Sequence, residues 1–223
     1  MIKFFEHYNP MNSNQSKSSE KSIKWHELSI DRKKLEAMHG HKGMVIWFTG
    51  LSGAGKSTLA NALNEALHLK GISTYVLDGD NIRHGLCKDL GFSDSDREEN
   101  IRRIGEVANL FMDAGIVAIT AFVSPFKADR DKVRSIIGNN DFIEIYCAAD
   151  LSVCEKRDTK GLYKKARLGE IKEFTGISSP YEIPENPEIS INTGTIALTD
   201  SVKQIIDYLN ENNLISITNN LSQ

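Results

Sequence analysis

Cysteine and excess charge are both scarce in this sequence. Its three cysteines, Cys87, Cys147 and Cys154, form no CxxC pair and have no histidine at metal-ligand spacing, which argues against a disulfide framework or a zinc site. The formal net charge is only −3, whereas proteins that bind duplex nucleic acid carry a strong basic excess. We therefore expect no nucleic-acid partner and no metal or organic cofactor that the protein holds permanently.

Long apolar runs are scarce as well. No stretch approaches the roughly 20 apolar residues of a membrane-spanning helix, and Met1 to Tyr8 shows neither the apolar core nor the cleavage pattern of a secretion signal. Cys147 lies in an apolar run, where a free thiol usually acts as a small buried side chain. With reduced thiols and no export signal, we expect a cytoplasmic protein without a membrane partner.

The composition suits one α/β domain with polar ends. Apolar residues make up 40% and charged residues 26% of the 223 residues, as in ordinary globular proteins. Residues 12–22 are almost wholly polar and cannot bury enough surface to offset the cost of ordering. We predict a flexible N-terminal tail at 1–22, one domain over 23–210 and a C-terminal tail at 211–223.

Strand and helix patterns alternate along the predicted domain. Short apolar runs predict strands, and apolar residues at helical spacing predict helices. The predicted strands are 44–49, 73–77, 116–123, 142–147 and 189–192. The predicted helices are 31–38, 56–70, 96–114, 128–137 and 201–209. This alternation predicts a three-layer α/β fold with a central parallel sheet flanked by helices, and ligands at the carboxyl ends of its strands.

A glycine-rich turn joins the first predicted strand to the helix after it. The run Gly50-Leu51-Ser52-Gly53-Ala54-Gly55-Lys56-Ser57 matches the P-loop pattern GxxxxGK[ST] in its required context. Main-chain N–H groups and the helix start would bind phosphates, with Lys56 on the β and γ phosphates and Ser57 on Mg²⁺. The motif predicts a nucleoside triphosphate with Mg²⁺ in this site, with Thr58 beside it. By itself it leaves motor, GTPase, transporter ATPase and small-molecule kinase open.

Two carboxylates follow the second predicted strand. Asp78 and Asp80 stand two residues apart, so both face the same side if the strand continues. Phosphoryl transfer uses a carboxylate to position the attacking hydroxyl, and Asp80 is the candidate. The alternative is that either carboxylate caps the turn, which fits Asp78 better.

Arginines and an asparagine follow these carboxylates. Arg97 and Asn100 are one helical turn apart on one face of a predicted helix. Together with Arg83 they are suited to bind oxyanions through charge-assisted hydrogen bonds. The alternative is a solvated, salt-bridged helix surface, which we expect for Arg102 and Arg103.

Six blocks of the sequence resemble adenylylsulfate kinase. They follow the family's order and are far more specific than a P-loop alone. The blocks are WFTGLSG at 47–53, DGDNIRHGL at 78–86, LGFS at 90–93, DREENIRRIGEV at 96–107, FVSPF at 122–126 and KGLYK at 160–164. The resemblance covers about 23–209. It implies a P-loop kinase that transfers the γ-phosphoryl group of ATP to the 3′-hydroxyl of adenylyl sulfate, in sulfate assimilation.

The resemblance also assigns the acceptor pocket by position. It implies that Arg83, Arg97 and Asn100 bind the phosphosulfate and ribose region. Phe92 and Phe174 would sandwich the adenine, as aromatic faces stack on bases, although without the resemblance Phe92 would be interpreted as a core residue. The full expected substrate-binding set is Asp80, Asn81, Arg83, Phe92, Arg97, Asn100, Val123, Ser124, Lys160 and Phe174.

The candidate catalytic residues are Lys56, Asp80 and Ser124. The resemblance makes Ser124 the position of a phosphoserine intermediate. A serine nucleophile needs an adjacent base, and no histidine or lysine neighbours Ser124 in the sequence. Direct in-line transfer from ATP is the simpler mechanism, and we expect Ser124 and the Val123 backbone to contact substrate.

A run of charged residues follows the fourth predicted strand. Such a run is usually a solvated helix face, but nucleoside-type kinases place a lid here that excludes water from the phosphates. We expect a mobile lid at about 156–176, with Arg157 facing ATP and Lys160 closing over the acceptor. Glu173 stands where the family commonly has glycine, which affects rate and affinity more than identity.

Two partners and two rival functions complete the expectations. The resemblance implies a homodimer and functional coupling to ATP sulfurylase. One rival is a P-loop kinase for a sugar acid or another nucleotide, which would not explain the aromatic and basic acceptor set. The other is a nucleotide-binding regulatory or scaffold module without catalysis, against which the intact P-loop and Asp80 argue.

Overall fold

The structure is a computed structural model that describes residue 24 and residues 26–215. The predicted tail at 1–22 and residues 216–223 lie outside the described residues. The strands are β1 (Met44–Thr49), β2 (Thr74–Asp78), β3 (Val117–Ala121), β4 (Phe142–Cys147) and β5 (Ile189–Ile191). The helices are α1 (Arg32–His39), α2 (Lys56–His68), α3 (Gly79–Arg83), α4 (Asp94–Asp113), α5 (Lys127–Ile137), α6 (Leu151–Arg157), α7 (Leu162–Arg167) and α8 (Leu198–Glu211).

The sheet has five parallel strands in the order β2-β3-β1-β4-β5. Its central strand β1 has the sequence MVIWFT, and all of its residues are buried. From β1 the chain goes first to the β2–β3 side of the sheet and later to the β4–β5 side. The turn after β1 is therefore at the reversal of strand order, where α/β sheets bind ligands.

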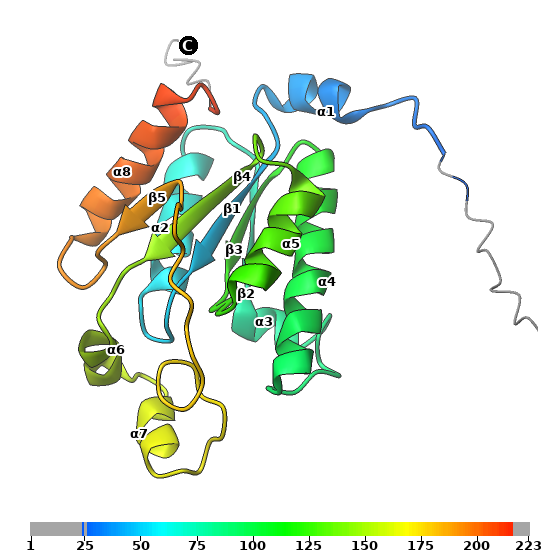
Figure 1. Cartoon of the computed structure of the whole chain (residues 1–223). Coiled ribbons are helices and arrows are strands. Elements are labelled where there is room, and N and C mark those ends of the chain that lie inside the picture. Colours follow the sequence, from blue (N-terminus) through cyan, green and yellow to red (C-terminus); the bar gives the residue numbers. More distant parts are fainter. Residues whose placement is uncertain (1–23, 25, 216–223) are drawn as a thin grey trace, which may run out of the picture.

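Helices cover both faces of the sheet (Figure 1). On one face, apolar residues of α2 and α8, such as Leu63 and Ile205, pack with Ile46 and Phe48 of β1. On the other face, α4 and α5 pack around Trp47. Successive residues of a strand point to opposite faces, so β1 contributes to both cores. The predicted three-layer fold with a central parallel sheet is confirmed.

Some helices differ from the sequence prediction. Helix α4 begins at Asp94 rather than at 96, because the Ser93 side chain caps it by accepting a hydrogen bond from the Asp96 N–H. The sequence did not predict α3, α6 and α7, which have 5, 7 and 6 residues and are too short to show a helical period. Arg102 and Arg103 pair with Glu99, as expected of a surface helix.

The described chain stays packed past residue 210, where we expected the domain to end. Helix α8 continues to Glu211, and Ile215 is buried in the core cluster beneath α2 and α8. Cys147 is buried as predicted, and burial raises the pKa of its thiol to about 12. Within the described residues, no helix combines the length and apolar character needed to cross a membrane.

Candidate active site

One cavity of about 1090 Å³ opens at the carboxyl ends of the strands. This volume is at the upper end of the range for small-molecule pockets, roughly 300–1,000 Å³. The α6–α7 segment lies beyond the strand ends (Figure 1) and contributes Arg157, Lys160 and Tyr163 to the cavity lining. The predicted site residues that line the cavity are Ser52, Gly53, Gly55, Lys56, Ser57, Thr58, Asp80, Arg83, Phe92, Arg97, Asn100, Val123, Ser124, Arg157, Lys160 and Phe174.

Four predicted residues do not line the cavity. Gly50 and Ala54 belong to the P-loop but form its inner side, and a Cβ at Gly50 would lie 2.7 Å from the Cys147 carbonyl oxygen. Leu51 packs against the core beside Gly176. Asn81 is on α3 with its side chain exposed. Of these four, Asn81 alone lies outside the P-loop.

The P-loop holds Lys56 in the floor of the cavity. Gly55 has φ 87°, a left-handed conformation that favours glycine, directly before the first residue of α2. The Lys56 ammonium is buried and donates hydrogen bonds to the carbonyls of Gly50 at 2.9 Å and Leu51 at 2.8 Å. Burial lowers the pKa of Lys56. A desolvated cation above the loop is suited to bind an oligophosphate.

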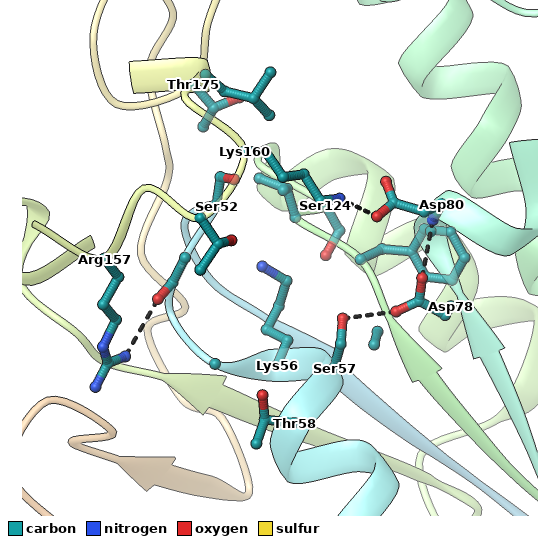
Figure 2. Close-up of a pocket in the computed structure, with 18 of the residues that line it drawn as sticks. Ser52, Lys56, Ser57, Thr58, Asp78, Asp80, Ser124, Arg157, Lys160 and Thr175 are labelled. Carbon is teal, nitrogen blue, oxygen red and sulfur yellow. Dashed lines mark hydrogen bonds and ion pairs between the residues drawn. The ribbon is translucent and has the colours of Figure 1, made fainter. Parts of the chain in front are cut away.

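Ser57 and Asp78 join two strand ends at the cavity. The Ser57 hydroxyl donates to Asp78 Oδ2 at 2.6 Å, and Asp78 Oδ1 accepts from the Asp80 N–H at 3.0 Å (Figure 2). Asp78 therefore caps α3, as its sequence context predicts, and also places a carboxylate beside the P-loop serine. Sequence reasoning missed the second role, because the Ser57 contact joins positions 21 residues apart.

Three side chains connect the α6–α7 segment to the rest of the site. Arg157 donates to the Gly53 carbonyl at 3.2 Å and to the Thr193 carbonyl at 2.7 Å. Lys160 forms an ion pair with Asp80 (Figure 2). The Tyr163 hydroxyl donates to the Ser52 carbonyl at 2.9 Å. The segment that we predicted as a lid thus contacts both the P-loop and Asp80, the candidate catalytic carboxylate.

Arg83 and Arg97 form the basic end of the cavity. Arg97 donates to the Thr175 hydroxyl and the Glu173 carbonyl, both at 2.6 Å, and Arg83 donates to the Gly91 carbonyl at 2.8 Å. Among the described residues, neither guanidinium has a carboxylate partner within salt-bridge distance. Burial and, to a smaller extent, the nearby Arg83 lower the pKa of Arg97. Two neighbouring cations of this kind favour an anionic ligand.

Aromatic rings and one unpaired amide surround this basic end. Phe92 is 66% exposed, with Arg83 stacked 4.5 Å from its ring centre, so it is not a core residue. Phe174 lines the same cavity and rests edge-on against Tyr163, with ring centres 5.0 Å apart. Asn100 is only 4% exposed, and its Nδ2 has no hydrogen-bond partner among the described residues. Buried amides rarely stay unpaired, which indicates a ligand here.

Ser124 lies at the cavity wall after β3. Its side chain is buried. Among the described residues, only Trp47 Nε1 forms a hydrogen bond with Ser124 Oγ, donating to it at 3.1 Å. An indole N–H donates and cannot accept a proton, so Trp47 is no general base. Within this part of the chain, Ser124 therefore lacks the activating partner that a serine nucleophile requires.

Glu173 has a left-handed backbone with φ 55°. Glycine adopts this conformation without the steric cost that a side chain brings. The carbonyl of Glu173 accepts from Arg97, so the turn helps to place that arginine. The backbone conformation gives a physical reason for the glycine expected at this position.

Three features define this protein as a P-loop phosphotransferase for a small anionic acceptor. They are the central parallel sheet, the P-loop at the reversal of strand order, and the basic and aromatic end of the same cavity. The family model described as adenylylsulphate kinase matches residues 42–192. The chain belongs to the adenylylsulphate kinase family.

Close relatives agree with this membership. The adenylyl-sulfate kinase of Prochlorococcus marinus is 67% identical over 194 residues, which are 87% of this chain and 96% of that protein. The adenylyl-sulfate kinase of Citrobacter koseri is 58% identical over 196 residues, which are 88% and 97%. The solved structure of the Mycobacterium tuberculosis APS kinase in complex with AMPPNP and APS superposes with a TM-score of 0.73 at 46% identity, covering 76% of this chain and 99% of that one.

Proposed function

We propose that this chain transfers the γ-phosphoryl group of ATP to the 3′-hydroxyl of adenylyl sulfate, giving ADP and 3′-phosphoadenylyl sulfate. The observation that carries the proposal is a cavity that joins the P-loop to an acceptor pocket. Among the described residues, Arg83 and Arg97 there bind only carbonyl and hydroxyl oxygens and no carboxylate, and the Asn100 amide has no acceptor. Neither rival function needs that combination. Family membership and the adenylyl-sulfate kinases among the relatives support the same reaction.

The P-loop side binds ATP. Main-chain N–H groups of 50–55 and the start of α2 surround the β and γ phosphates, and Lys56 moves from the loop carbonyls to the transferring group. Arg157 lies against Gly53 and faces the nucleotide. The Ser57 hydroxyl and the Asp78 carboxylate are hard oxygen ligands that would hold the Mg²⁺ that accompanies ATP. Bound there, the ion would neutralise phosphate charge.

The opposite side binds adenylyl sulfate. Arg83 and Arg97 bind its phosphosulfate, and the Asn100 amide donates to the ribose region. Phe92 and Phe174 stack on the adenine, which aromatic–base stacking stabilises by about 1–3 kcal/mol per contact. Lys160 moves with the lid from Asp80 to the bound anions. Asn81 contributes only through α3, since it lies outside the cavity.

Asp80 acts on the attacking hydroxyl. Once Lys160 releases it, its carboxylate orients the 3′-hydroxyl and accepts its proton while the hydroxyl attacks the γ phosphorus in line. The bond from the γ phosphorus to the bridging oxygen breaks, and ADP leaves. Ser124 and the Val123 backbone contact the acceptor, and no phosphoserine forms.

The test uses purified protein, ATP, Mg²⁺ and adenylyl sulfate, with ADP and 3′-phosphoadenylyl sulfate as the products measured. Parallel reactions replace the acceptor with gluconate or AMP. Turnover of adenylyl sulfate alone supports the proposal. Turnover of gluconate or AMP but not adenylyl sulfate indicates the first rival, and ATP binding without any turnover indicates the scaffold module.

The remaining expectations about the cellular context belong to the same proposal. The protein acts in the cytoplasm as a homodimer, which family resemblance supports and sedimentation of the purified protein tests. It depends on an ATP sulfurylase, because adenylyl sulfate must come from a reaction that joins sulfate to the α-phosphate of ATP. Co-purification of that enzyme from the native cell tests whether the coupling is physical.

A further inference from the structure

The turn that carries Ser124 has a backbone that needs outside support. Ser124 has φ 38°, in the left-handed region that side-chain-bearing residues rarely adopt. Such conformations persist only where the surroundings hold them, and they gather at functional sites. Ser124 and its neighbours Val123 and Pro125 line the cavity on the acceptor side.

Arg130 of α5 holds this turn from behind. Its side chain is 3% exposed, and it does not line the cavity. Nη1 donates to the Ser124 carbonyl at 2.7 Å, and Nη2 donates to the Glu182 carbonyl at 2.8 Å. Burying a guanidinium costs much desolvation free energy. The stability of the domain therefore does not by itself explain why an arginine occupies position 130.

Arg130 also belongs to a network of ion pairs. Its Nε lies 2.8 Å from Oε1 of Glu144 on β4, whose other oxygen lies 3.3 Å from Arg134. Arg134 in turn binds Glu188 through both terminal nitrogens, at 2.7 and 2.8 Å. Arg134 therefore shares the network but, among the described residues, makes no contact with the Ser124 turn.

Two further side chains determine what the turn presents to the cavity. Trp47 Nε1 donates to Ser124 Oγ, so the hydroxyl acts as an acceptor there and its own hydrogen is free to donate. The Thr49 hydroxyl donates to the Val123 carbonyl at 2.8 Å. Ser124 lines the cavity, and no acceptor holds its O–H among the described residues, so the hydroxyl is available to donate to a ligand there.

We propose that Arg130 is a positioning residue for the acceptor substrate: by binding the Ser124 carbonyl it holds the strained turn so that the Ser124 hydroxyl donates a hydrogen bond to an oxygen of adenylyl sulfate. The inference rests on the proposed function. It assigns Arg130 no contact with substrate and no part in ATP binding.

The experiment compares Arg130→Met with Arg134→Met as the matched control. Both changes remove one arginine from the Glu144 network, Arg130 being 3% and Arg134 20% exposed, so both lower the melting temperature. Only Arg130→Met releases the Ser124 carbonyl. For that variant we expect kcat/KM for adenylyl sulfate to fall about five- to tenfold, the effect of losing the neutral hydrogen bond from Ser124, with the KM for ATP within about twofold of wild type. Arg134→Met should keep both parameters within about twofold.

The outcomes separate this inference from the proposed function. Equal kinetic losses in the two variants, or an unchanged kcat/KM for adenylyl sulfate in folded Arg130→Met, would overturn the inference. A wild-type protein that does not turn over adenylyl sulfate would overturn the function instead. If Arg130→Met does not fold, Arg130→Lys serves in its place, since lysine keeps the buried charge but cannot bind both carbonyls and Glu144 together. The same selective loss is then expected.

Discussion

Replacing Ser124 by alanine distinguishes the two mechanisms open to this kinase. Alanine keeps the backbone and removes only the hydroxyl, whose hydrogen-bond partner among the described residues is the Trp47 indole. If the hydroxyl only donates to the substrate, its loss removes one neutral hydrogen bond of about 0.5–1.5 kcal/mol. This corresponds to a decrease of about 2- to 10-fold in kcat/KM for adenylyl sulfate. A serine nucleophile would instead lose activity by orders of magnitude.

The stability change provides an internal check on this prediction. Alanine leaves the buried Trp47 N–H without its acceptor, at a cost of about 1–3 kcal/mol. For a domain of this size, the melting temperature falls by about 2–4 °C per kcal/mol. The assay follows ADP release and searches for phosphoprotein in wild type after reaction with γ-labelled ATP. Abolished turnover in a folded variant that still binds ATP, or a labelled wild-type protein that passes its phosphate to adenylyl sulfate, would refute direct transfer.

Three further predictions follow from the same geometry. Lys56→Ala and Asp80→Ala should each lower kcat by orders of magnitude at saturating substrate, since both residues act on the reacting groups, and single-turnover measurements should place the loss in the chemical step. Lys160→Met should raise the KM for adenylyl sulfate while the melting temperature stays within about 4 °C, because exposed ion pairs contribute about 0–1 kcal/mol; a large loss of stability with unchanged KM would contradict it. Burial lowers the pKa of Lys56 in the folded state, so the unfolded chain binds this proton more tightly. The contribution of Lys56 to the free energy of unfolding therefore rises with pH between its lowered pKa in the folded state and its pKa of about 10.4 in the unfolded state. Urea unfolding at a series of pH values should show this rise in wild type and not in Lys56→Met.

The parts of the site that depend on short, local patterns could be predicted from the sequence. The P-loop needs only a strand, a glycine-rich turn and a helix in succession, so residues 50–57 can be assigned from their order in the chain. Alternating apolar runs were enough for the three-layer fold. The acceptor residues depended on the family resemblance. Phe92, for example, would have been interpreted as a core residue, and its 66% exposure corrects that interpretation.

Contacts between segments that are distant in the chain could not be predicted from the sequence. For Asp78 the sequence favoured capping and did not predict the bond to Ser57, because that bond requires β2 and the P-loop to meet at one edge of the sheet. The burial of Arg130, which is 3% exposed, could not be predicted, because a single arginine in a charged helix resembles any surface arginine in sequence. Helices α6 and α7 are too short for periodicity, and their position at the cavity depends on contacts such as that of Tyr163 with Ser52.

The amino-acid sequence by itself determined which chemical groups are present and which of them share a loop or a helix face: phosphate-binding glycines with Lys56, carboxylates two residues apart, and an arginine and an asparagine one turn apart. Only the tertiary structure decided which of these groups meet. Hydrogen bonds and desolvation act over a few ångströms, and the packing of helices against one sheet brings Lys160 to Asp80, Arg97 to Thr175 and Arg130 to Ser124 from far along the chain.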